Sequence, residues 1–83
     1  MLHPKAARSL KKLPPAVSKR IVASLRELEA APDKGERLSD SQFIRVRVGD
    51  YRAIYEVDGR AKRVIVLYVG HRSTVYDDFS KLL

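Results

Sequence analysis

The spacing of apolar residues changes near the middle of the chain, and this change limits the possible folds more than any other feature. Before position 33, apolar residues recur every three or four positions, at Ala6, Leu10, Leu13, Val17, Ile21, Leu25 and Leu28. After position 43 they alternate with polar residues, at Ile44, Val46 and Val48. A period near 3.6 predicts helices and a period of 2 predicts strands. We therefore expect a helical first half and a sheet in the second half.

Prolines divide the helical half into two helices. The pair Pro14-Pro15 interrupts the first apolar stripe, and Pro15 suits the first turn of a second helix. Pro32 ends that helix, because a residue before proline disfavours helical backbone angles. Residues 33–42 are mostly polar, contain Gly35 and are expected to form a loop. The first half is thus predicted to be an αα-hairpin.

Three strands are predicted in the second half, over residues 44–48, 51–57 and 63–69. Gly49-Asp50 and Asp58-Gly59 are typical of tight turns between antiparallel strands. Residues 64–69 are all apolar, which favours a central strand for this segment. The chain is expected to leave the sheet at Gly70 and to form a short helix within residues 75–83. The predicted fold is α+β, with the helical hairpin packed on a three- to four-stranded antiparallel sheet in one domain over residues 1–83.

The charge of the chain favours a polyanionic partner. There are 17 Lys and Arg against 10 Asp and Glu, giving a net charge of +7. RNA, DNA or an acidic protein would suit this balance, although a merely basic soluble surface stays an alternative. The chain has no cysteine, and its histidines, His3 and His71, are too few for a zinc site, so we expect neither metal nor cofactor. Without a membrane-length apolar run or a signal peptide, the expected location is the cytoplasm.

Arginines form the candidate functional site. A period of 2 places Arg45 and Arg47 on one face of their strand, and the following turn brings Arg52 beside them. Guanidinium groups clustered in this way suit the bidentate binding of phosphate. The alternative is a solvated basic strand face in which the arginines pair with Asp50 or Glu56.

Three residues near the C-terminus complete the candidate site. His71 and Arg72 follow the last strand, and Tyr76 comes four residues later. Histidine commonly exchanges protons near neutral pH, whereas a lone histidine after a strand is more often a plain surface residue. Tyr76 could stack on an RNA base or could simply anchor the C-terminal segment.

These residues together resemble the RelE family within the RelE/ParE toxin superfamily. The similar segments are AARSLKKLP at 6–14, IRVRVGDYRAIYEV at 44–57 and VLYVGHRSTVY at 66–76. The resemblance implies a toxin that cleaves mRNA in the ribosomal A site, by metal-independent attack of a ribose 2′-OH on the adjacent phosphate. By the motifs, Arg45, Arg47, Arg52, Arg72 and Tyr76 match functional positions of the family, and His71 lies where a lysine or histidine is common.

This chain departs from the family pattern at two places. Arginines stand where the family has lysines on the second strand, and arginine is a poor proton donor or acceptor. His71 or Tyr76 is therefore the expected proton-transfer group. The family's first strand is expected to be truncated or missing here, because only residues 1–3 precede Pro4. That loss would leave one sheet edge unpaired.

The resemblance also implies partners. A cognate antitoxin is expected to form a hetero-oligomer with this chain, and mRNA with the 30S ribosomal A site is the expected target. Two other functions stay open. One is a ParE-like toxin that inhibits DNA gyrase, and the other is a catalytically degenerate member that only binds nucleic acid.

Overall fold

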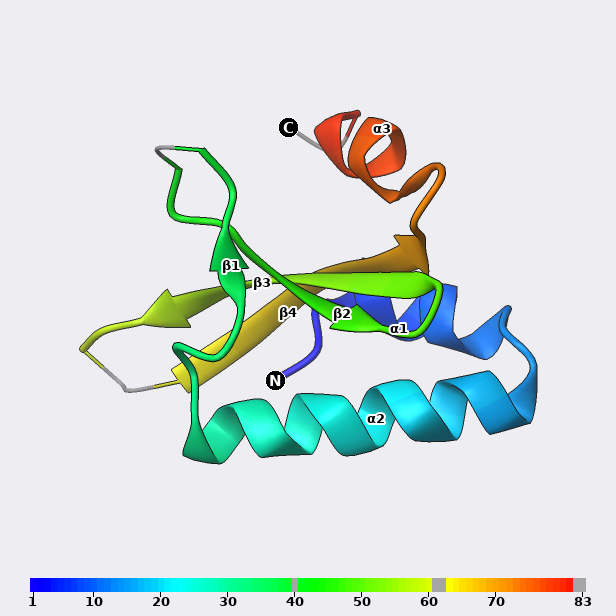
Figure 1. The fold of residues 1–83 in the computed structure, drawn as a ribbon, viewed down its shortest axis with the longest axis horizontal. Coiled ribbons are helices and arrows are strands. Elements are labelled where there is room, and N and C mark those ends of the chain that lie inside the picture. The colour runs from blue at the N-terminus through cyan, green and yellow to red at the C-terminus, as the bar shows by residue number, and fades with distance from the viewer. Residues whose placement is uncertain (40, 61–62, 82–83) are drawn as a thin grey trace.

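The computed structural model, which describes residues 1–39, 41–60 and 63–81, has three layers (Figure 1). Helices α1 (Pro4–Lys11) and α2 (Pro15–Ala30) cover one face of a sheet, and α3 (Val75–Ser80) lies over the other face. The antiparallel strands β1 (Glu36–Arg37), β2 (Ile44–Val48), β3 (Tyr51–Asp58) and β4 (Arg63–His71) lie side by side in chain order. The predicted α+β fold is confirmed. Within the described ranges, no helix is long and apolar enough to cross a membrane.

The main core lies between the helical hairpin and the sheet. The hairpin contributes the predicted apolar stripes, whose buried members are Ala6, Leu10, Ile21, Leu25 and Leu28. The sheet contributes one face of each long strand, including the fully buried ring of Tyr55. A second, smaller core forms on the opposite face, where Val75 and Phe79 of α3 cover Ile54. The sheet is therefore covered on both faces, but α3 covers only part of the second one.

One strand lies where a loop was expected. Within residues 33–42, Glu36 and Arg37 pair with Arg45 and Ile44 as the short edge strand β1. Asp40, also in the predicted loop, lies outside the described residues. Two residues are too few to show an apolar period, so the sequence pattern could not reveal this strand. β1 nevertheless places Glu36 beside the predicted arginine site.

The expectation that residues 64–69 form a central strand is met only in part. β4 is the last strand of the sheet, and it is apolar on both faces because α1 packs on one and α3 on the other. The first strand of the family was expected to be truncated or missing, and in the structure it is truncated. Leu2 forms a parallel bridge with Val66, and the His3 N–H donates to the Val66 carbonyl at 2.8 Å. Residues 1–3 thus pair with part of the outer edge of β4.

A bulge in β4 changes which face its last residues occupy. Ile54 lies opposite Tyr68 and Tyr55 lies opposite Val66, so Leu67 is an extra residue. Both Leu67 and Tyr68 consequently pack in the second core, while Val69 returns to the main core. β4 then continues through Gly70 to His71, two residues beyond the expected end. As a result, His71 pairs with Tyr51 on the hairpin side of the sheet.

Candidate functional site

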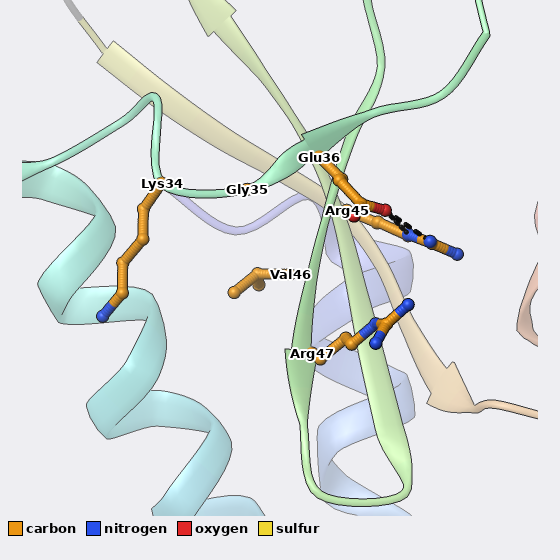
Figure 2. A pocket seen from close by; sticks show the side chains of 6 residues that line it. All are labelled: Lys34, Gly35, Glu36, Arg45, Val46 and Arg47. Carbon is orange, nitrogen blue, oxygen red and sulfur yellow. Dashed lines mark hydrogen bonds and ion pairs between the residues drawn. The ribbon is translucent and has the colours of Figure 1, made fainter.

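Alternation along β2 and β3 gathers three arginines on the sheet face opposite the helical hairpin. Arg45 and Arg47 extend from the same side of β2 as Glu36 does from β1, while Val46 points the other way (Figure 2). Arg52 of β3 is the cross-strand partner of Arg47. The predicted placement of these arginines on one face is therefore present in the structure.

A hollow of about 410 Å³ lies on this face and combines most of the predicted residues. It is lined by Arg45, Arg52, His71, Arg72, Ser73 and Tyr76. Arg47 does not line it. Arg47 is exposed and lines an adjoining hollow of about 280 Å³ together with Arg45 and Glu36 (Figure 2). Arg45 borders both hollows, so the two form one basic region over β2 and β3.

The guanidinium of Arg45 is held from two sides. Its Nη1 donates a 2.7 Å hydrogen bond to the hydroxyl oxygen of Tyr76, and its Nε donates to Glu36 Oε2 at 3.1 Å. The guanidinium carbon lies 5.9 Å from the centre of the Tyr76 ring. The bond with Tyr76, followed by the bond with Glu36, raises the pKa of Arg45 above its ordinary value, so the group stays cationic. These contacts fix the direction in which the charge faces.

Glu36 is a site residue that the sequence pattern did not reveal. The hydrogen bond and the charge of Arg45, with a further contribution from Arg47, hold the pKa of Glu36 below its ordinary value. The expected alternative partners, Asp50 and Glu56, lie elsewhere. Asp50 faces Arg72, and Glu56 accepts a 3.1 Å hydrogen bond from the Gln42 amide. Glu36 was hidden because it lies in a segment with no strand pattern.

Arg52 and Arg72 supply the remaining cations of the hollow. Nη1 of Arg52 donates to the carbonyls of Gly49 and Tyr51, at 2.9 and 2.8 Å. Arg72 lies 3.9 Å from Asp50 across an exposed ion pair, with 64% of the Arg72 side chain exposed. An exposed pair of this kind contributes about 0–1 kcal/mol, so a phosphate can replace the carboxylate at little cost.

His71 reaches the rim of the hollow, but its ring is engaged elsewhere. The ring lies 5.5 Å from that of Tyr51, at an interplanar angle of 85°. Its Nδ1 accepts the Ser73 N–H at 3.2 Å and lies 2.8 Å from the Ser73 hydroxyl. A neutral ring whose Nδ1 accepts a hydrogen bond carries its proton on Nε2. His71 in this arrangement therefore orders the turn before α3.

Tyr76 is positioned by the packing of α3 on the sheet. Phe79 contacts Phe43 edge to face, with ring centres 5.1 Å apart. Gly70 allows the start of α3 to lie close to β4, because a Cβ there would meet the side chain of Val75 at 3.3 Å. These contacts bring the Tyr76 hydroxyl over β2. The described residues contain no group of three or more His, Cys, Asp and Glu side chains that could hold a metal ion. The three arginines that line the hollow suit the binding of an anion.

Comparisons with known proteins identify the relatives of this chain. A family model described as the ParE toxin of the type II toxin–antitoxin system parDE matches residues 1–76. No curated protein matches the sequence. A chain of the RelBE2 toxin–antitoxin complex from Mycobacterium tuberculosis is 30% identical, with a TM-score of 0.74, and the match covers 87% of this chain and 94% of that one.

Two further solved structures share the fold. A chain of the RelB–RelE antitoxin–toxin complex from Methanococcus jannaschii is 26% identical, with a TM-score of 0.75 and coverage of 95% and 98%. The isolated RelE toxin from E. coli is 23% identical, with a TM-score of 0.74 and coverage of 98% and 93%. These similarities extend over nearly all of each chain, so the helical hairpin, the sheet and α3 belong to one shared arrangement.

Proposed function

This chain belongs to the ParE toxin family of type II toxin–antitoxin systems and has the fold of RelE toxins, and from that premise we propose that it is an endoribonuclease that cleaves mRNA on the ribosome. The single observation that carries the proposal is the shared hollow. Arg45, Arg52 and Arg72 come from three parts of the chain, and they border one cavity together with Tyr76. A cavity of this composition suits an RNA phosphate with a base beside it.

The proposed reaction is attack of a ribose 2′-OH on the adjacent phosphorus. The new 2′ oxygen–phosphorus bond forms as the bond to the 5′ oxygen breaks, which leaves a 2′,3′-cyclic phosphate and a 5′-hydroxyl. Negative charge accumulates on the phosphate oxygens during this step. Arginines fixed before the reaction stabilise that charge, which is often the largest contribution to such catalysis. Arg52 and Arg72 face the phosphate in this proposal, and Arg45 and Arg47 extend the cationic surface along the strand.

Tyr76 is the proton donor in this proposal. The bond from Arg45 uses a lone pair of the phenol oxygen, so the hydroxyl proton stays available for the departing 5′ oxygen. His71 is placed less well, because its Nδ1 is occupied by Ser73 and its ring packs near Tyr51. The proton of the 2′-OH passes to solvent or to a group of the ribosome–mRNA complex.

Cleavage is tested on ribosomes that carry a defined mRNA. Primer extension after incubation with the purified toxin should reveal cuts within the codon in the A site. Naked mRNA should be cut far more slowly, because the ribosome orders the 2′-OH and the phosphate for in-line attack. Intact mRNA under these conditions would contradict the proposal.

Inhibition of DNA gyrase is the second candidate, and the match to the ParE toxin family favours it. A gyrase inhibitor would block supercoiling or leave cleaved DNA while mRNA stayed whole. The same purified protein can be given to both assays. A catalytically degenerate member would bind RNA, but it would neither cleave mRNA on ribosomes nor inhibit gyrase.

We also infer that a cognate antitoxin binds this chain, since the M. tuberculosis and M. jannaschii neighbours are toxin–antitoxin complexes. A mostly apolar hollow of about 160 Å³ supports this inference. Met1 and Leu2, 61% and 41% exposed, line it together with Val22, Leu25, Val64 and Val66, and Arg26 and Glu29 complete the lining. Apolar side chains of an antitoxin segment would fill this hollow. Co-expression with the product of a neighbouring short reading frame should suppress growth arrest and yield a co-purifying complex.

A further inference from the structure

The positive charge of this chain is distributed very unevenly. Residues 1–26 contain seven Lys and Arg and no Asp or Glu, while the remaining ten Lys and Arg are matched by ten Asp and Glu. The excess of seven positive charges therefore lies in residues 1–26, which form α1 and most of α2. The candidate site lies on the opposite sheet face, in the half of the chain whose charges cancel. The candidate site therefore does not account for the positive charge of residues 1–26, which points to a different binding partner or surface.

Four of the seven cations gather where the two helices meet. The Ser18 hydroxyl donates a 2.7 Å hydrogen bond to the Leu10 carbonyl, which joins the first turn of α2 to the last turn of α1. The residues beside these two form what we call the elbow cluster, which consists of Lys11, Lys12, Lys19 and Arg20. All four side chains are exposed.

Within the described residues, no member of the elbow cluster forms an ion pair. The ion pairs among residues 1–39, 41–60 and 63–81 join Lys34 to Glu27, Arg45 to Glu36, and Arg72 to Asp50, so they involve no member of the cluster. Like charges this close repel each other, and a bound polyanion would relieve that repulsion. The cluster is therefore charged in a way that favours association with an anion.

The surface around the cluster suits a nucleic acid backbone better than a protein. Stable protein interfaces depend on apolar and aromatic anchors at their centre. Among the described residues, the exposed large hydrophobic side chains are Met1, Leu2 and Val57, and none of them lies at the elbow. Val17 and Tyr51 line a hollow beside Arg20, but both are half-buried against the main core. Sugar–phosphate backbone requires only well-placed cations, and it binds them regardless of sequence.

Arg20 connects the elbow to the candidate site. Its guanidinium lies over the β2–β3 turn, where Nη1 would be 3.3 Å from a Cβ added to Gly49. Arg20 also shares a hollow of about 160 Å³ with Asp50, which in turn faces Arg72. Asp50, at the β2–β3 turn, thus lies between Arg20 of the elbow and Arg72 of the arginine hollow.

We propose that the elbow cluster is a second RNA-binding surface, which docks the sugar–phosphate backbone of structured RNA away from the reacting phosphate. This function goes beyond cleavage, and it would hold the toxin on an RNA-rich target whether or not a cut follows. It also explains why residues 1–26, whose inner face only packs on the sheet, contain seven Lys and Arg and no Asp or Glu.

Matched triple variants test the proposal. Lys11→Gln/Lys12→Gln/Lys19→Gln removes three charges from the elbow, and Arg60→Gln/Arg63→Gln/Lys81→Gln removes three exposed charges elsewhere. Glutamine keeps a polar side chain and has a helix propensity close to those of lysine and arginine. Binding to a labelled RNA duplex is measured by fluorescence anisotropy without ribosomes, between 50 and 200 mM salt, a range over which backbone binding changes strongly.

We expect the elbow triple to lose about tenfold or more in affinity, and its salt slope to become shallower by roughly one unit per lost phosphate contact. The control triple should stay close to wild type. Equal losses in both triples would overturn the proposal, because net charge alone would then explain binding. Unchanged RNA affinity with lost binding to an acidic peptide would also overturn it, since the elbow would then be a protein surface.

Two further measurements distinguish a loss of RNA binding at the elbow from unfolding of the variant and from a failure of the nuclease proposal. Thermal unfolding of both triples checks the fold, and the single variant Lys12→Glu should show the same loss of RNA binding if the triple unfolds. Wild-type protein that binds the duplex but leaves ribosomal mRNA intact would contradict the nuclease proposal alone. Cleavage without elbow-dependent binding would contradict the docking proposal alone.

Discussion

The hydroxyl oxygen of Tyr76 accepts a 2.7 Å hydrogen bond from Nη1 of Arg45, although the two residues are 31 positions apart in the chain. This contact joins α3 to β2 across the face that bears the arginines. It gives the short C-terminal helix a place in the candidate site, because α3 supplies the phenol and the packing that holds it there. Changes to this helix should therefore affect activity more than they affect stability.

Replacing Tyr76 with phenylalanine tests this contact directly. Loss of the proposed proton donor should slow mRNA cleavage on ribosomes by about 10²–10⁴-fold. Loss of one hydrogen bond should reduce the free energy of unfolding by only about 1 kcal/mol. Tyr68→Phe is the matched control, since Tyr68 packs in the same second core. A Tyr76→Phe enzyme as fast as the Tyr68→Phe enzyme would exclude the assigned role.

Arg52→Ala and Arg72→Ala should each abolish growth arrest. Each removes a cation from the hollow, and loss of one group that stabilises developing charge costs about 10²–10³-fold in rate. Arg52→Lys should restore binding to RNA but only part of the cleavage, because lysine lacks the bidentate fork. Arg63→Ala, an exposed change distant from the hollow, should leave toxicity intact. Thermal unfolding of Arg52→Ala and Arg72→Ala should occur near the wild-type temperature, which would show that the loss of toxicity does not result from unfolding.

Glu36 should act on cleavage through Arg45. Glu36→Ala removes a negative charge from the RNA-binding face and releases Arg45, so RNA should bind a few-fold more tightly while the cleavage rate at saturation falls. Glu36→Gln removes the charge but keeps an acceptor for Arg45, and it should recover most of the rate. Glu56→Gln provides the control on the same sheet face. If Glu36→Ala kept the full rate, Arg45 would not depend on this contact.

Tyr55 should make stability depend on alkaline pH. Its hydroxyl donates to the Pro32 carbonyl at 2.9 Å and accepts the Gly35 N–H at 3.2 Å, and burial raises its pKa above the ordinary value of 10.0. The unfolded chain therefore ionises first as pH rises. The stability from Tyr55 is complete below pH 10.0 and is lost as pH climbs toward the higher pKa of the folded state.

Tyr55→Phe separates this effect from the titration of other groups. The variant should lose about 1–3 kcal/mol at neutral pH, because two backbone groups lose their partner. Its stability should then fall less steeply than that of wild type above pH 10.0. Urea unfolding at a series of pH values measures both effects, with Tyr51→Phe as the control. Parallel curves for wild type and Tyr55→Phe would show that Tyr55 is not the group responsible.

Much of this architecture follows from local patterns. The apolar stripes of residues such as Ile21 and Leu25 predict the hairpin, because burial of one helix face requires that spacing. Alternation predicts that Arg45 and Arg47 share a face, and the turn at Gly49 brings Arg52 beside them. These features depend only on backbone periodicity and on short turns, which a sequence displays directly.

The features that the sequence could not predict depend on contacts between distant segments. The bulge at Leu67 lies in a wholly apolar run, so no break in alternation marks it, and it turns His71 toward Tyr51. β1 has only two residues, so the approach of Glu36 to Arg45 is set by strand pairing alone. The bond between Arg45 and Tyr76 depends on how α3 packs across the sheet.

Gly70→Ala should change the site without touching any of its side chains. A Cβ at position 70 would lie 3.3 Å from both Cβ and Cγ2 of Val75, closer than ordinary contact, so Val75 at the start of α3 must give way by a few tenths of an ångström. A shift of α3 in that direction would weaken the contact of Tyr76 with Arg45, and we expect cleavage to fall by up to about 10²-fold, the loss that follows a displacement of about 1 Å. The free energy of unfolding should fall by about 1–3 kcal/mol, the usual cost of overpacking, which is less than the cost of truncating a large core side chain.

Gly59→Ala is the matched control, because nothing lies within 4 Å of a Cβ there. Cleavage assays and thermal unfolding of both variants decide the matter, and normal cleavage by Gly70→Ala would show that the site tolerates a shifted α3.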